Sequence, residues 1–218
     1  RDVTGVQTCA LPIFGSTPED SDEEVLEAAS QGHSEIVKIL IDAGALENVA
    51  LRGGAHYVAA AAAVGSIDIV EMLLAARADP DVEDFEGLTA LMVAARKGHV
   101  NIMRLLISHH KDSVNLESSR GVTALDMAVL ENQLEAARML LDAGANVYSY
   151  RYPQDRYNVT NLAVSHDSVE LTRLLLAAKA RPATVAEYDS DPLIVVASRK
   201  GNAEIVRDLL NFGIRQLE

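Results

Sequence analysis

Few residues in this 218-residue chain have the types and spacing that catalysis or metal binding requires. The adjacent pair His109–His110 could supply metal ligands, but neighbouring residues point in different directions on a helix. We expect the pair to lie at a helix C-terminus, where positive charge is favourable. The segment Asp79-Pro80-Asp81 is typical of a turn rather than of paired catalytic carboxylates. The sequence offers no nucleophile–base pair and no Gly-rich phosphate loop, so we expect no enzyme, no metal site and no cofactor.

The N-terminal segment has a different origin from the rest of the chain. Residues 3–13 read VTGVQTCALPI, which resembles the translation of a common sequencing adapter. We interpret residues 1–13 as an adapter-derived artefact and residues 14–20 as a linker. The single cysteine, Cys9, lies in this segment, so we expect no disulfide or thiolate chemistry. The natural N-terminus is then missing, which leaves an upstream domain or a targeting signal open.

Composition and charge restrict the class of partner. Apolar residues make up 49% of the chain and aromatic residues only 4%, which favours closely stacked short helices over a β-sandwich. The net charge of −13 argues against nucleic acid and anionic membranes, and favours a basic protein or a basic patch on one. No apolar run approaches the roughly 18 residues that a membrane span needs. We expect a monomer in the cytoplasm, with secretion left open because the natural N-terminus is missing.

A repeat organises the chain. Six turn residues, each placed shortly after an Ala-containing segment, recur at spacings of 33, 33, 34, 35 and 34 residues. They are Gly32, Gly65, Gly98, Asn132, Asp167 and Gly201. A second apolar block with a polar middle residue follows each turn, so each unit predicts a helix, a tight turn, a second helix with one exposed face, and a polar connection. Reversal of the chain at the turn requires a positive φ, which Gly, Asn and Asp tolerate best.

The clearest unit, EGLTALMVAARKGHVNIMRLLI at residues 86–107, closely resembles the ankyrin consensus. The matching framework residues are Gly87, Thr89, Leu91, Ala94, Ala95, Gly98 and His99, and Gly121, Thr123, Leu125 and Ala128 repeat part of the pattern. The resemblance implies an all-α solenoid of stacked antiparallel helix pairs joined by β-turn or hairpin fingers. It covers residues 21–218, in units of about 21–51, 52–84, 85–117, 118–153, 154–187 and 188–218.

Several positions depart from the consensus or vary between the units. The hydroxyls of Thr89 and Thr123 are still suited to cap their helices. Glu27 stands where the other units carry an apolar residue, so we interpret the first unit as a capping repeat with a polar outer face. Ala136-Ala137 replaces Ile-Val in the fourth unit, and the fifth unit fits the pattern worst. We therefore expect units four and five to be the least stable.

The resemblance also implies where a partner would bind, because ankyrin arrays use the concave face formed by the fingers and the exposed side of the first helices. By position these residues are Phe85, Glu86, Leu88, Arg96, Lys97, Ser119, Arg120, Val122, Leu130, Glu131, Tyr188, Asp189, Arg199 and Lys200. The segment YSYRYPQDRY is a second candidate, since Tyr and Arg dominate binding hot spots. Its residues are Tyr148, Tyr150, Arg151, Tyr152, Arg156 and Tyr157, and packing of these tyrosines under a long loop is the alternative.

The expected function follows from this surface and not from catalytic groups. We expect a non-enzymatic scaffold that binds a partner protein along the concave groove. The alternative is a regulatory or targeting segment of a larger enzyme or secreted effector whose other domain is missing. Fold alone does not identify the target, since one architecture serves many partners.

Overall fold

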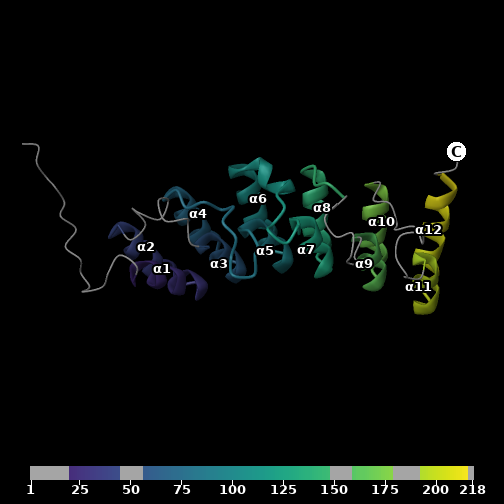
Figure 1. Cartoon of the computed structure of the whole chain (residues 1–218), viewed down its shortest axis with the longest axis horizontal. Helices are drawn as coiled ribbons and strands as arrows, with labels where there is room; N and C mark the ends of the chain where they lie inside the picture. The colour runs from purple at the N-terminus through teal and green to yellow at the C-terminus, as the bar shows by residue number, and fades with distance from the viewer. Residues whose placement is uncertain (1–19, 45–55, 148–158, 179–191, 216–218) are drawn as a thin grey trace, which may run out of the picture.

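The computed structural model of the chain describes residues 20–44, 56–147, 159–178 and 192–215. Figure 1 shows helices side by side in an elongated row, with α1 and α2 at one end and α11 and α12 at the other. The α-helices of these residues are α1 (Asp20–Ser30), α2 (Ser34–Asp42), α3 (Tyr57–Val64), α4 (Ile67–Ala75), α5 (Ala90–Lys97), α6 (Val100–His109), α7 (Ala124–Leu130), α8 (Leu134–Asp142), α9 (Val159–Ser165), α10 (Val169–Ala177), α11 (Leu193–Lys200) and α12 (Ala203–Arg215). A short 3-10 helix, η2 (Lys111–Asn115), follows α6. The described residues contain no strand, which confirms the all-α prediction.

The helices form successive pairs, and each pair stacks on the next. The first helices of neighbouring pairs contact one another, so that α5 lies between α3 and α7. The second helices also contact along the row, with α6 between α4 and α8. Each pair therefore shields its apolar sides chiefly against its neighbours, as in a solenoid.

The turn within each pair has the predicted left-handed conformation. The φ angle is +72° at Gly98, +53° at Asn132 and +59° at Asp167, and the other three turn residues are also positive. A residue with a Cβ is disfavoured in this region, and Asn and Asp are among the better-tolerated exceptions. The prediction from residue type and spacing is thus confirmed at all six turns.

The first helices bring both alanines and larger side chains such as Leu91 into the core, and the second helices bring mainly branched ones. Ala94 and Ala95 are fully buried in α5, where the absence of bulk lets α3, α5 and α7 approach closely. In α6, Ile102 and Leu106 are buried, while Arg104 between them is exposed as predicted.

The buried side chains separate into two clusters along the row. The larger cluster extends from α1 to α10, and its last members are Leu171 and Leu175. The smaller cluster joins Val164 and Leu176 to the side chains of α11 and α12, including Ile205 and Leu209. The last helix pair is therefore held to α9 and α10 by a small cluster that the two pairs share.

The two predicted threonine caps differ. Thr123 forms a capping box at the start of α7: its hydroxyl oxygen accepts from the Asp126 backbone N–H, and the Asp126 carboxylate accepts from the Thr123 backbone N–H at 2.8 Å. Thr89 occupies the same place before α5, but its side chain makes no cap hydrogen bond. Its hydroxyl is buried and has no hydrogen-bond partner among the described residues. The prediction is therefore confirmed for Thr123 and wrong for Thr89.

Candidate functional site

The finger between α4 and α5 is a tight turn held by one aspartate. The Asp84 carboxylate accepts hydrogen bonds from the backbone N–H groups of Glu86 and Leu88, both at 2.9 Å. The Asp84 N–H donates to the Leu88 carbonyl at 2.9 Å, and the Gly87 N–H donates back to the Asp84 carbonyl. Gly87 has a φ of +76°, which this reversal requires. The buried Leu88 side chain, 4% exposed, anchors the finger in the core.

This turn presents Phe85 to solvent. The Phe85 side chain is 84% exposed, although it is the largest apolar residue of the finger. One edge of its ring meets the ring of His56, which directly precedes α3, at a centroid distance of 4.1 Å and an angle of 67°. A large aromatic ring held on a hydrogen-bonded turn can bury much apolar area on binding while losing little conformational freedom.

Next to this turn, Arg96 of α5 forms a bidentate ion pair with Glu86 of the finger. Its Nη1 lies 2.5 Å from Glu86 Oε2 and its Nη2 lies 3.2 Å from Oε1. The hydrogen bond and then the charge of Arg96 lower the pKa of the Glu86 carboxyl, and Glu86 in turn raises the pKa of Arg96. The pair fixes the finger against the helix face.

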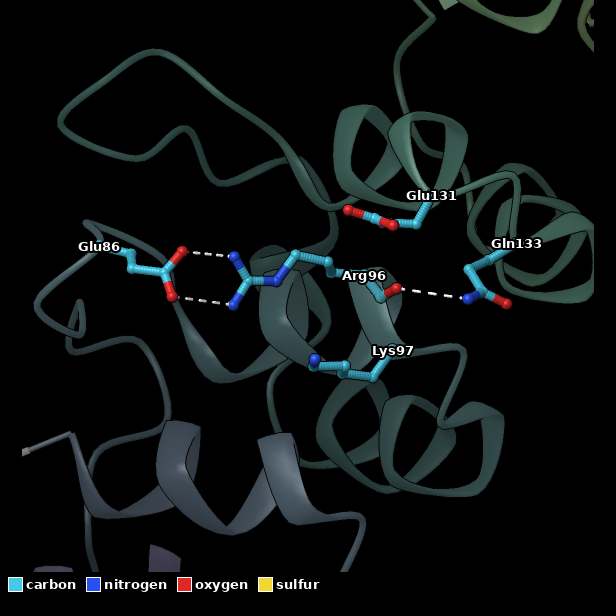
Figure 2. Close-up of a pocket in the computed structure, with 5 residues that line it drawn as sticks. All are labelled: Glu86, Arg96, Lys97, Glu131 and Gln133. Atoms are coloured by element: carbon cyan, nitrogen blue, oxygen red, sulfur yellow. Dashed lines mark hydrogen bonds and ion pairs between the residues drawn. The ribbon is translucent and has the colours of Figure 1, made fainter. Parts of the chain in front are cut away.

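A hollow of about 440 Å³ lies beside this ion pair. Figure 2 shows the residues that line it. Its lining residues are Glu86, Arg96, Lys97, Glu131 and Gln133. The Gln133 side-chain amide donates to the Arg96 carbonyl at 3.4 Å and so links two neighbouring helix pairs. Among the described residues, Lys97 and Glu131 form no ion pair, which leaves one cation and one carboxylate available to a ligand. The hollow is polar, and its charges suit side chains of a polypeptide.

The finger that precedes α7 forms a similar turn, held by a serine in place of an aspartate. Ser118 takes the place of Asp84: its hydroxyl oxygen accepts from the backbone N–H groups of Arg120 and Val122, both at 3.2 Å. The Glu83 carboxylate of the preceding finger accepts from both the backbone N–H and the hydroxyl of Ser119. The two fingers are therefore joined side by side, and Arg120 is exposed next to Phe85 and Glu86 in the row.

The structure exposes most of the predicted contact residues that it describes. Those exposed are Phe85, Glu86, Lys97, Ser119, Arg120, Leu130, Glu131, Arg199 and Lys200. Arg96 is half-buried, Leu88 is buried and Val122 is partly buried against the core. We leave Leu88 and Val122 out of the contact surface, because side chains that anchor the fingers in the core are turned away from solvent.

The predicted contact residues Tyr148, Tyr150, Arg151, Tyr152, Arg156, Tyr157, Tyr188 and Asp189 lie outside the described residues.

Three residues of this surface were not predicted. Val64 is 45% exposed and occupies the place of Lys97 one unit earlier, so counting back 33 residues would have found it. Gln133 and His56 stand at the edges of their helices, and the repeat pattern assigns them no surface role. Only the spatial contacts with Arg96 and Phe85 identify them.

The histidine and aspartate residues that could have bound a metal or taken part in catalysis have structural roles. His110, which directly follows α6 as predicted, places its Nδ1 2.5 Å from Asp81 Oδ2. The same carboxylate accepts from the Ser113 hydroxyl at 2.7 Å, so it ties the finger to η2. Asp79 accepts from the Asp81 backbone N–H, which is the predicted turn chemistry. The described residues contain no group of three or more His, Cys, Asp or Glu side chains arranged to hold a metal ion.

Comparison with known proteins agrees with this architecture. Residues 56–151 match the family model for ankyrin repeats, in three copies. The match spans α3 to α8, which carry the Phe85 finger and the polar hollow. No curated protein matches the chain. None of the helices in the described ranges has the length and apolar character to cross a membrane. Ankyrin repeats are in general modules of protein–protein interaction. The stacked helix pairs, the left-handed turns and the matched repeats together identify residues 56–151 as ankyrin repeats.

Proposed function

We propose that this chain is a non-enzymatic scaffold that binds a partner protein across the fingers and the exposed side of the first helices. The observation that carries the proposal is the isolated exposure of Phe85 beside the polar hollow. Aromatic residues are enriched at the centres of protein interfaces, and polar residues form the rim around them. The hydrogen bonds of Asp84 and the Arg96–Glu86 pair support a contact surface that is ordered before binding.

Charge favours a basic partner. The finger at residues 79–88 carries five carboxylates and no lysine or arginine, in a chain with a net charge of −13. Several of these carboxylates accept internal hydrogen bonds. Such a partner would have an apolar pocket that receives Phe85. Lys or Arg residues around that pocket would pair with the carboxylates of the finger. Association should then slow as salt is raised.

The test is affinity capture from extracts of the cells that make the protein, with quantitative comparison of variants. We expect a partner that the wild type retains and that Phe85→Ala retains at least about tenfold less tightly, because loss of an aromatic anchor typically costs more than about 1.4 kcal/mol. Glu131→Lys should weaken the same partner, because it replaces a carboxylate of the hollow with a cation.

The matched control is Arg104→Ala, since Arg104 is exposed on a second helix, away from the fingers. Equal retention by Arg104→Ala and the wild type is expected. A partner that Phe85→Ala and Glu131→Lys retain as well as the wild type would contradict the proposed surface.

A further inference from the structure

The first helix pair leaves one side uncovered. We use the term end face for this side of α1 and α2, defined by Glu23, Glu27, Ile36 and Ile39. Ile36 is 48% exposed and Ile39 is 66% exposed, and both glutamates are exposed as well. Figure 1 shows this pair at one end of the row, opposite α12. The end face therefore combines two large aliphatic side chains with two carboxylates.

The repeat shows what normally covers the Ile36 position. The equivalent residues of inner pairs, such as Ile69 and Ile102, are at most 2% exposed. Ile205 holds this place in α12, and its side chain is 0% exposed. Among the described residues, the pair of α11 and α12 has a neighbouring pair only on its preceding side. The position is therefore buried by the pair that precedes it. The end face continues the established helix-to-helix interface of the array, and a packed helix is the element that fits it.

The α1 half of the end face differs from an ordinary repeat surface. Glu27 replaces an apolar residue that is buried elsewhere, as at Val93 and Met127, and Glu23 lies one turn before it on the same side of the helix. The predicted polar outer face is thus present on α1 but not on α2. A further repeat packed here would bury two carboxylates without cations, which is costly. A second copy of the chain would bring another charge of −13 toward them.

We propose that the end face binds an amphipathic, basic helix of a partner protein. The apolar stripe of that helix packs on Ile36 and Ile39, and Lys or Arg residues at its edge pair with Glu23 and Glu27. Recognition of this kind uses anchors at i, i+3, i+4 and i+7 of the bound helix. The site lies on a different surface from the fingers, so the array can hold this helix and the partner at Phe85 together.

The probe is a synthetic helical peptide with Leu at i, i+3, i+4 and i+7 and Lys at the flanking positions. Its matched control carries Glu in place of Lys. Fluorescence anisotropy with the full chain should show binding of the Lys peptide only. Ile36→Ser with Ile39→Ser should raise the Kd at least about tenfold, since both anchors lose their contact. Glu23→Gln with Glu27→Gln should raise the Kd and flatten its dependence on salt.

Two further variants separate this site from the rest of the molecule. Leu210→Ser changes a 51% exposed side chain of α12 at the opposite end, and Phe85→Ala changes the proposed finger site. Neither should alter the Kd of the Lys peptide by more than about twofold. Both end-face variants alter exposed residues, so an unchanged thermal midpoint is expected for each.

Three results would overturn the proposal. The first is equal binding of the Lys peptide by the wild type and the Ile36→Ser, Ile39→Ser variant. The second is loss of peptide binding in Phe85→Ala alone, which would assign the peptide to the fingers. The third is self-association of the wild type by sedimentation that the isoleucine variant abolishes, which would assign the end face to a second copy. The first and third results do not bear on capture of a partner through Phe85.

Discussion

Thr89 and Thr123 occupy the same place in neighbouring units, yet their replacement by valine should have opposite effects. Thr123→Val removes the cap hydrogen bond to Asp126, which should cost about 1 kcal/mol of the free energy of unfolding. Thr89→Val removes a buried hydroxyl without a hydrogen-bond partner among the described residues, whose desolvation costs about 1–3 kcal/mol. Because valine has nearly the same shape, we expect Thr89→Val to be neutral or to stabilise the array by about 1 kcal/mol. The two variants should thus differ by about 2 kcal/mol.

Thermal unfolding followed by circular dichroism measures this difference. For a domain of this length, 1 kcal/mol shifts the midpoint by about 2–4 °C, so the two variants should melt about 4–8 °C apart. Each valine variant serves as the control of the other, since backbone, burial and β-branching are matched. A loss of stability in Thr89→Val as large as that in Thr123→Val would refute the reasoning, because it would mean that the Thr89 hydroxyl also caps its helix.

Three other perturbations test the array. Asn132→Ala should destabilise by about 1–2 kcal/mol in chemical denaturation, because Ala pays the steric cost of a positive φ, whereas Asn132→Gly should not. Burial raises the pKa of Asp126, so protonation of this carboxyl favours the folded state. The wild type should therefore gain stability relative to Asp126→Asn as the pH falls from neutral through the raised pKa toward about 3.9. Equal slopes of the unfolding midpoint against pH for the two proteins would exclude this effect. Hydrogen exchange should be fastest in α8 to α10, where Ala136 and Ala137 reduce core volume, and uniform protection along the array would contradict this.

Residue type and spacing were sufficient to predict the repeat, the turns and the exposed face of the second helices. These features depend on the local chain: a positive φ restricts the residue at Asn132, and a 3.6-residue period places Arg104 in solvent. The candidate contact residues Phe85, Arg96 and Lys97 came from the ankyrin resemblance, whose concave face was carried over to this chain by position.

The errors occurred where a contact with a neighbouring unit decides the outcome. Leu88 has the same local pattern as an exposed finger residue, but it is buried in the core. The pairing of Asp81 with His110, 29 positions apart, depends on the 3-10 helix that follows α6, which the repeat does not predict. The exposure of Ile36 on the end face could not be predicted from its residue type either. Isoleucines at the same place in later units, Ile69, Ile102 and Ile205, are all buried.

The division of the buried side chains into two clusters has a consequence for how the molecule opens. Because the apolar side chains of α11 and α12 pack on Val164 and Leu176, the terminal pair loses its core when α9 and α10 open. Local opening of α9 and α10 would therefore release α11 and α12 together with them. The Phe85 finger, which lies between α4 and α5, would keep its shape through such events, so that partial opening of the array leaves the Phe85 site intact.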